Sequence, residues 1–463
     1  MNAQIAILAY GLLIAGLFVL NRDRNTRSSL ALWLPTIWLS ICASRMISAW
    51  FSTDAPEVTA NQYLEGSPLD RALLAVLVLL GLAVLFQRKH RVAGIVRSNS
   101  AIFLFVLYCA FSIAWSDFPA IAFKRWVKSL GDITMVLIVL TENNPLTAVK
   151  RWLSRAGFLL VPLSILFIKY FPDLGRGYNR FTWGAFYKGV AMGKNELGII
   201  CLIFGIFAVW RILHIRNERQ RARSRAPLTA MLILLVMISW LFWMANSMTS
   251  LACFITSSIL VLAAGLRLSL RKRWLIHATI AAMLAVIVST LFFGMGSEIV
   301  ETMGRSPTLT GRTDLWALVL NMSGNPLLGS GFESFWLGSR LEKIWAIYWW
   351  HPNEVHNGYI EVFLNLGWIG VVLLAFVLIA GYRNVIEAYR RNPEEGRLRI
   401  ALFFTAATYN CTESAVRIMH PIWIFLLLAA IAVPGGWSRV RSGETTSLAA
   451  KAFQAEETPI LVT

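Results

Sequence analysis

The sequence has little charge for its length. Asp, Glu, Lys and Arg make up 15% of its 463 residues, whereas about a quarter of a soluble domain is charged. Hydrophobic residues make up 57%. A single water-soluble core does not bury so large an apolar surplus, so part of it must face lipid. The composition therefore excludes an ordinary soluble protein and predicts an integral membrane protein.

The side chains that form disulfides or bind metals are few and poorly spaced for either purpose. None of the five cysteines belongs to a Cys-x-x-Cys pair, and all lie in or beside apolar segments. This spacing excludes a disulfide framework and a zinc site of the usual kind. His351 and His356 are separated by Pro352 and do not share one helical face. We therefore expect no bound metal.

Acidic residues are outnumbered by basic ones, and the formal net charge is +18. In a soluble protein this excess would suggest nucleic-acid binding. Here the Lys and Arg residues lie between apolar segments, where cytoplasmic loops of membrane proteins carry them. We therefore expect membrane lipids, and no nucleic acid, as partners.

Apolar runs of about the length of a membrane span recur along the whole chain and predict an all-α polytopic membrane protein with about 11–13 transmembrane helices. The runs are 3–20, 30–51, 69–86, 101–115, 126–141, 151–170, 190–213, 227–245, 247–266, 274–294, 357–382, 398–410 and 417–434. Residues 3–20 lack the flanks of a cleavable signal peptide and are taken as the first span.

The loops between these runs alternate in positive charge. One set holds roughly 27 Lys and Arg residues and the other roughly 12, which makes the first set cytoplasmic. With an odd number of spans, the N-terminus lies outside and the C-terminus inside. Residues 295–356 then form one large outer loop, rich in aromatic side chains. A loop of about 60 residues inside a folded chain is usually functional.

The chain divides into three regions. Residues 1–179 form N-terminal transmembrane helices, and residues 180–434 form a second membrane region that includes the loop 295–356. Residues 435–463 are polar and form a cytoplasmic tail without predicted structure.

One group of basic residues lies on the outer side, where the charge rule predicts few. Its members are Lys169, Arg176, Arg180, Lys188 and Lys194, around the start of the seventh apolar run. Such a group suits a phosphate or diphosphate at a helix N-terminus. Contact with lipid headgroups explains it equally well.

Other polar residues on the outer side are candidates for chemistry. His356, at the mouth of a span, has a reference pKa suited to a general base. Glu413 and Arg417, between the last two runs, lie near membrane depth and are either functional or an internal ion pair. Tyr359 and its aromatic neighbours form either an interfacial belt or a surface for stacking on sugars. Arg45 stands alone in an apolar run, and its role is open.

Several segments taken together resemble the O-antigen ligase and polymerase superfamily, and within it the exopolysaccharide polymerases of the ExoQ type. The family signature is a His, then Asn, Ser or Asp, then an aliphatic residue, with Gly seven positions after that. His356, Asn357, Ile360 and Gly367 fit it, with Ile where Leu is commoner. The resemblance covers about residues 180–430, through segments 193–198, 311–316, 325–333, 356–361 and 365–370.

This resemblance implies a GT-C-like membrane glycosyltransferase with one large periplasmic loop. Its donor would be an oligosaccharide or polysaccharide on undecaprenyl diphosphate, at the periplasmic face of the bacterial inner membrane. The family implies no nucleotide sugar, cofactor or metal, which agrees with the lack of an Asp-x-Asp pair. A polysaccharide flippase and chain-length or export proteins are the implied partners.

The resemblance also implies roles for particular residues. Arg312 and His356 would be catalytic, with Arg312 stabilising the departing diphosphate and His356 taking the hydroxyl proton. The group of Arg176, Arg180, Lys188 and Lys194 would bind the diphosphate. The remaining candidates would bind sugar or orient other residues: Asn357, Glu361, Trp336, Tyr359, Glu413 and Arg417.

Three other functions remain open on the sequence. A ligase would transfer finished O-antigen polysaccharide to lipid A core, with the same donor and the same residues. A transporter of polysaccharide or small anions would show paired interrupted spans, and no such pair is evident. A scaffold subunit of an export complex would have no need of Arg312 together with His356.

Overall fold

The computed structural model describes residues 2–22, 29–51, 66–178, 184–218, 225–266, 268–269, 272, 274–293 and 312–437. Nearly all regular structure in these ranges is helical, and one small antiparallel sheet pairs β1 (Arg176–Tyr178) with β2 (Ala185–Tyr187). The predicted all-α polytopic class is therefore confirmed.

Within the described ranges, six helices are long and apolar enough to cross a membrane. They are α1 (Ala3–Leu20), α5 (Pro68–Gln87), α9 (Pro145–Tyr170), α11 (Lys194–Glu218), α12 (Ala226–Ala245) and α19 (Gly358–Arg391). A seventh span is counted if α6 (Lys89–Ser98) is joined to α7 (Ser100–Phe111) and the turn that continues α7 to Trp115, a pair bent by 92°.

The other helices of the bundle are α2 (Trp33–Ala43), α8 (Pro119–Leu140), α13 (Met248–Ala263), α15 (Trp274–Phe293), α20 (Pro393–Tyr409) and α21 (Pro421–Ala430). Most of them are shorter or carry more charge, and in α15 only Trp274–Val286 counts as an apolar helix, which is shorter than a span. The number of spans, about 11–13, thus stays a prediction.

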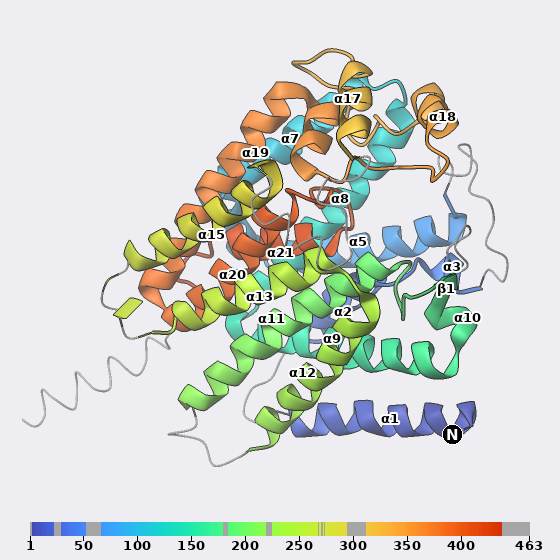
Figure 1. Ribbon diagram of the computed structural model, residues 1–463. Helices are drawn as coiled ribbons and strands as arrows, with labels where there is room; N and C mark the ends of the chain where they lie inside the picture. Colours follow the sequence, from blue (N-terminus) through green and yellow to red (C-terminus); the bar gives the residue numbers. More distant parts are fainter. Residues whose placement is uncertain are drawn as a thin grey trace, which may run out of the picture.

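Small elements complete the described structure. They are η1 (Leu30–Leu32), α3 (Ile47–Phe51), η2 (Ser112–Trp115), α10 (Pro172–Gly175), α17 (Arg312–Asn321) and α18 (Gly338–Ile347). In Figure 1 the N-terminal end of α1, α3, α10 and β1 all lie at the right, with α18 above them. The last turns of α11 and α19 lie at the opposite, left-hand end. The loops rich in Lys and Arg and the loops with fewer positive charges therefore lie at opposite ends of the bundle.

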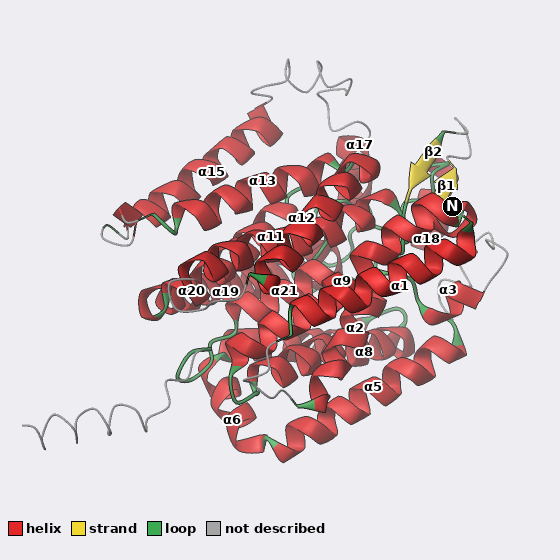
Figure 2. Ribbon diagram, turned by 90° about the horizontal axis from the view of Figure 1, so that it is seen from below, coloured by secondary structure: helices red, strands yellow, loops and turns green. Residues whose placement is uncertain are grey.

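The bundle has a buried centre and a lipid-exposed rim. All ten residues of α21 are buried, and its Phe425 stacks on Trp152 of α9 with ring centroids 5.8 Å apart. By contrast, only 11% of α1 is buried. This helix lies along the lower edge of the bundle in Figure 1 and across its near face in Figure 2. An apolar helix with its backbone hydrogen bonds closed internally is stable at such a position only in lipid.

A buried arginine of α20, paired with a glutamate of the same helix, ties α20 to α21. Arg399 contacts Glu395 at 3.0 Å, and both side chains are 2% exposed. Arg399 also donates hydrogen bonds to the carbonyls of Ala429 and Ile431, at 2.8 and 2.9 Å. These carbonyls lie at the C-terminal end of α21, where the helix itself provides no donors.

Arg45, whose role the sequence left open, holds backbone in place. Its guanidinium donates to the carbonyls of Ala191, Gly189 and Leu174, between α9 and α11. It also lies 4.9 Å from the centre of the Trp50 ring. These contacts satisfy the charge without a ligand.

The glycine of the family signature breaks α19 into two parts. Gly367 has φ of 63°, and a Cβ there would lie 2.2 Å from the carbonyl oxygen of Leu327. The amides of Trp368 and Ile369 donate to the carbonyls of Pro326 and Leu327, at 2.9 and 3.3 Å. The loop 325–331 therefore fits against the break, and only glycine allows both the conformation and the approach.

Gly367→Ala is accordingly expected to destabilise the protein by about 1–3 kcal/mol, since it adds both backbone strain and a steric clash. Thermal unfolding in detergent measures the effect. Gly16→Ala is the control, because a Cβ at Gly16 meets nothing within 4 Å. Equal melting temperatures for the two variants would contradict this account of the break.

Candidate active site

Three segments far apart in the sequence meet at one point of the bundle. They are the start of α17, residues 350–357 before α19, and residues 410–420 between α20 and α21. They are brought together by hydrogen bonds such as that from Gly358 N to the Asn410 carbonyl, at 2.9 Å. Each segment contributes at least one charged side chain to the same cluster.

His356 is at the centre of this cluster. Its Nδ1 atom lies 3.0 Å from Oε2 of Glu413 and 3.2 Å from Oε1 of Glu354. The Trp350 ring stacks against the imidazole at 6.2 Å between centroids. The backbone of His356 has φ of 54°, unusual for a residue with a side chain. With Nδ1 facing the two carboxylates, Nε2 is the nitrogen left to face a substrate.

Two arginines extend the cluster on either side. Arg312 contacts Oε1 of Glu413 at 3.2 Å, and Arg417 contacts Oε2 of Glu354 at 2.6 Å. The order is Arg312, Glu413, His356, Glu354, Arg417, and we call these five residues the ion-pair chain. The sequence had suggested a pair between Glu413 and Arg417. Instead, Glu413 pairs with Arg312 and His356, and Arg417 pairs with Glu354.

His356 and His420 lie in surroundings that shift their pKa values in opposite directions. Burial opposes the charged form of His356, but its hydrogen bonds to Glu354 and Glu413 raise its pKa to about 9. Burial also opposes the charge of Glu354, yet His356 and Arg417 lower its pKa to about 2. Burial and the nearby Arg417 lower the pKa of His420 to about 3. At neutral pH, therefore, His356 is mostly protonated and His420 is neutral.

Asn357 positions the residue before it by capping α19. Its Oδ1 accepts from the amides of Tyr359 and Ile360, at 3.0 and 3.1 Å, as an N-cap residue does. Its Nδ2 donates to the Cys411 carbonyl at 3.2 Å. The predicted orienting role of Asn357 is therefore compatible with its contacts.

Three other predicted sugar-binding residues already have partners in the protein. Glu361 accepts from Trp336 Nε1 at 2.7 Å and from the amide of Val355 at 3.1 Å. It thereby holds the backbone one residue before His356. The Tyr359 hydroxyl donates to the Ala407 carbonyl at 2.8 Å. These contacts suit positioning of the site better than direct contact with sugar.

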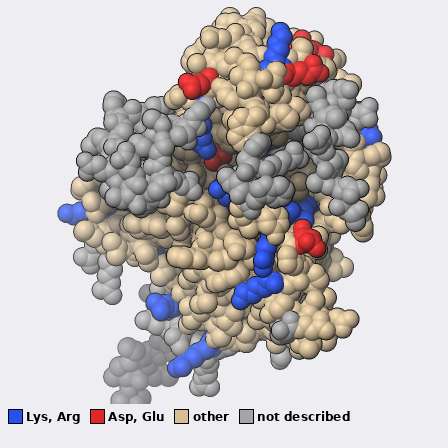
Figure 3. Space-filling view, turned by 45° about the vertical axis from the view of Figure 1, so that its right-hand side comes forward, with Lys and Arg blue, Asp and Glu red and all other residues tan. Residues whose placement is uncertain are grey.

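A cavity of about 320 Å³ opens beside the ion-pair chain. Its wall brings the start of α11 to the site, together with the end of α2 and the connection 410–420. The charged and polar residues of the wall are Asn195, Glu196, Asn353, Glu354, Glu413, Ser414, Arg417 and His420. Figure 3 shows basic side chains in the middle of the face in view, below the upper lobe.

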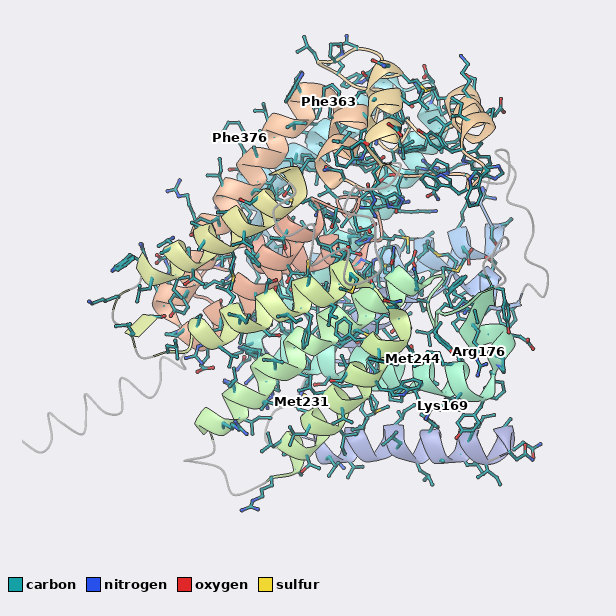
Figure 4. All side chains as sticks on the ribbon, viewed as in Figure 1. Lys169, Arg176, Met231, Met244, Phe363 and Phe376 are labelled. Carbon is teal, nitrogen blue, oxygen red and sulfur yellow. The ribbon has the colours of Figure 1, made fainter. Side chains whose placement is uncertain are left out.

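The predicted diphosphate-binding group is only partly assembled at this cavity. Lys194 is the first residue of α11, directly before the cavity residue Asn195. Arg176 lies on β1, where its Nε donates to the Ile168 carbonyl at 3.0 Å. In Figure 4 Arg176 lies close to Lys169, well below the top of the view where α17 lies. Lys188 directly follows β2, and Arg180 lies outside the described residues.

Two carboxylates had no role in the sequence interpretation. Glu354 lies in the segment that holds His356, but nothing in the sequence shows that it meets Arg417. Asp132, in α8, is fully buried and accepts from Trp38 Nε1 at 2.8 Å and from the amide of Met419 at 2.9 Å. It thus anchors the connection 410–420. The sequence did contain a sign of the role of Asp132, because an acidic residue inside an apolar run is a candidate for a functional or structural contact.

Three side chains of the cluster also offer ligand atoms to a metal. Atoms of Glu354, His356 and Glu413 lie within 4.8 Å of one another. However, each of the four carboxylate oxygens already contacts His356, Arg312 or Arg417. A metal ion would have to displace these cations. The charges suit an anion beside the arginines better than a metal between the carboxylates.

The fold and the site together define a polytopic membrane protein with a charged pocket at the head of a broken helix. A family model described as O-antigen ligase matches residues 221–375, which contain Arg312 and His356. The resemblance inferred from the motifs is therefore confirmed.

A particular relative agrees with this family. The chain is 26% identical over 323 residues to the exopolysaccharide production protein ExoQ of Rhizobium meliloti (strain 1021), which covers 66% of this chain and 70% of that protein. Both comparisons support a role in joining polysaccharide units, as polymerase or ligase.

Glu413→Gln and Glu354→Gln are each expected to lower the pKa of His356 from about 9 toward its ordinary value of 6.5, because each removes a negative charge beside the imidazole. NMR titration of histidine-labelled protein measures the pKa, with the His356 signal assigned from its loss in His356→Gln. Glu342→Gln, which removes an exposed carboxylate of α18, is the control. If the pKa of His356 were unchanged in both test variants, the contacts of His356 with Glu413 and Glu354 would be contradicted.

Proposed function

We propose that this protein is a glycosyltransferase that moves a glycan from undecaprenyl diphosphate to an acceptor sugar hydroxyl, in exopolysaccharide synthesis. The observation that carries the proposal is the ion-pair chain, with His356 between two carboxylates and an arginine at each end. Similarity to the O-antigen ligase family and to ExoQ supports this class of reaction.

In this reaction His356 is the general base. Its neutral form donates Nδ1–H to Glu413 or Glu354, and Nε2 takes the proton of the acceptor hydroxyl. The hydroxyl oxygen then forms a bond to the anomeric carbon, while the bond from that carbon to the diphosphate oxygen breaks. The resulting imidazolium is stabilised by both carboxylates, which lowers the energy of the transition state.

The electron pair of the broken bond leaves with the diphosphate, which gains negative charge. Fixed cations stabilise that charge more in the transition state than in the ground state. Arg312, 25% exposed at the edge of the cluster, is proposed to face it. Arg176, Arg180, Lys188 and Lys194 are proposed to hold the diphosphate before the reaction. Because diphosphate is a good leaving group, the proposal needs no metal.

The proposed location follows from the charge of the loops. The arginine-rich ends of α11 and α19 would face the cytoplasm, and the ion-pair chain would face the periplasm of a bacterial inner membrane. The region 180–434 would be catalytic and residues 1–179 would support it. A flippase would deliver the lipid-linked donor, and chain-length or export proteins would receive the product.

The matching family model is described as O-antigen ligase, which favours lipid A core as an alternative acceptor. In O-antigen ligation, the finished polysaccharide would be transferred to lipid A core. The same donor would bind at the same ion-pair chain, and only the acceptor pocket would differ.

Loss of His356 should slow the reaction by about 10²–10⁴-fold, since the variant lacks the general base. Arg312→Ala should slow it by about 10²–10³-fold, through weaker stabilisation of the leaving group. Cells in which the gene is deleted and replaced by His356→Ala or Arg312→Ala should accumulate lipid-linked repeat units and lack long polymer.

The matched control is His351→Ala, because His351 stacks on Trp345 at 4.7 Å and is not part of the ion-pair chain. Normal polymer from either test variant would remove that residue from the proposed mechanism. Long polymer that forms but stays on its lipid carrier in the deletion strain would favour the ligase.

The pH dependence of the reaction follows from the raised pKa of His356. Only the neutral form accepts a proton, so the rate should rise with pH, reach half its maximum near pH 9 and level off above it. Purified protein in nanodiscs, with lipid-linked donor, measures the rate between about pH 6 and pH 10. Glu413→Gln should move the inflection to lower pH. A rate that falls over this range would show that His356 acts as a cation instead.

A further inference from the structure

A second polar cavity lies at the other end of α19 from His356. Its volume is about 560 Å³. It is formed by the bend between α6 and α7, by the start of α15 and by the last turns of α19. Its charged and polar residues include Ser98, Asn99, Ser100, His277, Asn384, Glu387, Arg383 and Arg390. The proposed reaction uses none of them.

An apolar cavity of about 330 Å³ lies next to the polar one. It lies between α15, α19 and α20. Its aliphatic and aromatic wall includes Ile280, Leu284, Val385, Ile400, Phe403 and Phe404. His277 and Tyr382 line both cavities, and His277 Nδ1 lies 2.5 Å from the Tyr382 hydroxyl. The two spaces therefore meet at this pair.

The polar cavity has a surplus of positive charge. Arg383 is exposed and makes no ion pair with any described residue. Glu387 is 2.9 Å from Arg391 and 3.9 Å from Arg390, so its charge is already shared between two arginines. Its neutralisation leaves Arg383 as a net positive group in the wall. An anionic ligand fits this cavity better than a neutral or cationic one.

The direction of the two cavities fits a lipid. The polar cavity lies at the ends of the helices, and the apolar one extends along α15 from His277 to Leu284, a rise of about 10 Å. A headgroup at the membrane surface and an acyl chain below it have the same arrangement. The end of α19 lies with the other arginine-rich helix ends at the left of Figure 1, which the charge of the loops predicts to be cytoplasmic.

We propose that a phospholipid with an anionic headgroup binds here, with its phosphate beside Arg383 and Arg390 and one acyl chain between α15 and the α19–α20 pair. Basic pockets between transmembrane helices on the cytoplasmic side commonly bind anionic lipid. This site is separate from the proposed glycosyltransferase site and does not depend on that function.

Native mass spectrometry of the full-length protein tests the site, with phosphatidylglycerol or phosphatidylcholine added after removal of co-purified lipid. Wild type should retain phosphatidylglycerol over phosphatidylcholine. Arg383→Gln/Arg390→Gln should weaken retention of phosphatidylglycerol by about tenfold or more. Arg22→Gln/Arg225→Gln removes the same charge from residues outside the cavities and should have little effect.

A second pair of variants tests the acyl-chain cavity. Ala281 lines it, and Ala281→Trp should fill it and weaken lipid retention. Ala282 is exposed and does not line it, so Ala282→Trp is the control. Soluble glycerol phosphate should compete poorly, because it lacks the chain.

Four results would overturn the proposal. They are equal retention of the two lipids by wild type, equal effects of the two arginine pairs, full retention by Ala281→Trp, and competition by glycerol phosphate as strong as that of the lipid. Size-exclusion chromatography of every variant confirms that the chain is folded. Activity of the site at His356 is measured separately, so failure here does not bear on the proposed reaction.

Discussion

The placement of Glu413 between Arg312 and His356 is the interaction on which the site depends. Its two oxygens contact different partners, at 3.2 and 3.0 Å, and the three residues come from three separate segments of the chain. A carboxylate that is 7% exposed is stable as an ion only with such partners. The same contacts that satisfy its charge therefore fix the connection 410–420 against α17 and the start of α19.

The backbone around His356 is held from several directions. Asn357 caps α19, Glu361 binds the amide of Val355, and Asp132 binds the amide of Met419. This support explains how His356 keeps a positive φ, which the chain alone would disfavour. A rigid setting suits a proton acceptor that must face a sugar hydroxyl at a fixed distance.

The sequence predicted the fold class well, but some of the apolar runs begin several residues later than the helices that they predict. The apolar runs 126–141 and 398–410 correspond to α8 and α20, which begin at Pro119 and Pro393. The missed turns contain charged residues such as Arg125 and Glu395. Hydropathy alone ends a span at a charge, whereas in the structure Glu395 is buried with Arg399 and stays within the helix.

By itself the sequence determined the all-α membrane class, the charge asymmetry of the loops and the residues of the family signature, because these are properties of local composition and spacing. Only the tertiary structure decided which charges meet. Arg312 and Glu413 are 101 residues apart, and His356 and Glu413 are 57 apart. Such pairs depend on how distant helices pack, so neither the raised pKa of His356 nor the pairing of Glu354 with Arg417 could be predicted before the helices were placed in space.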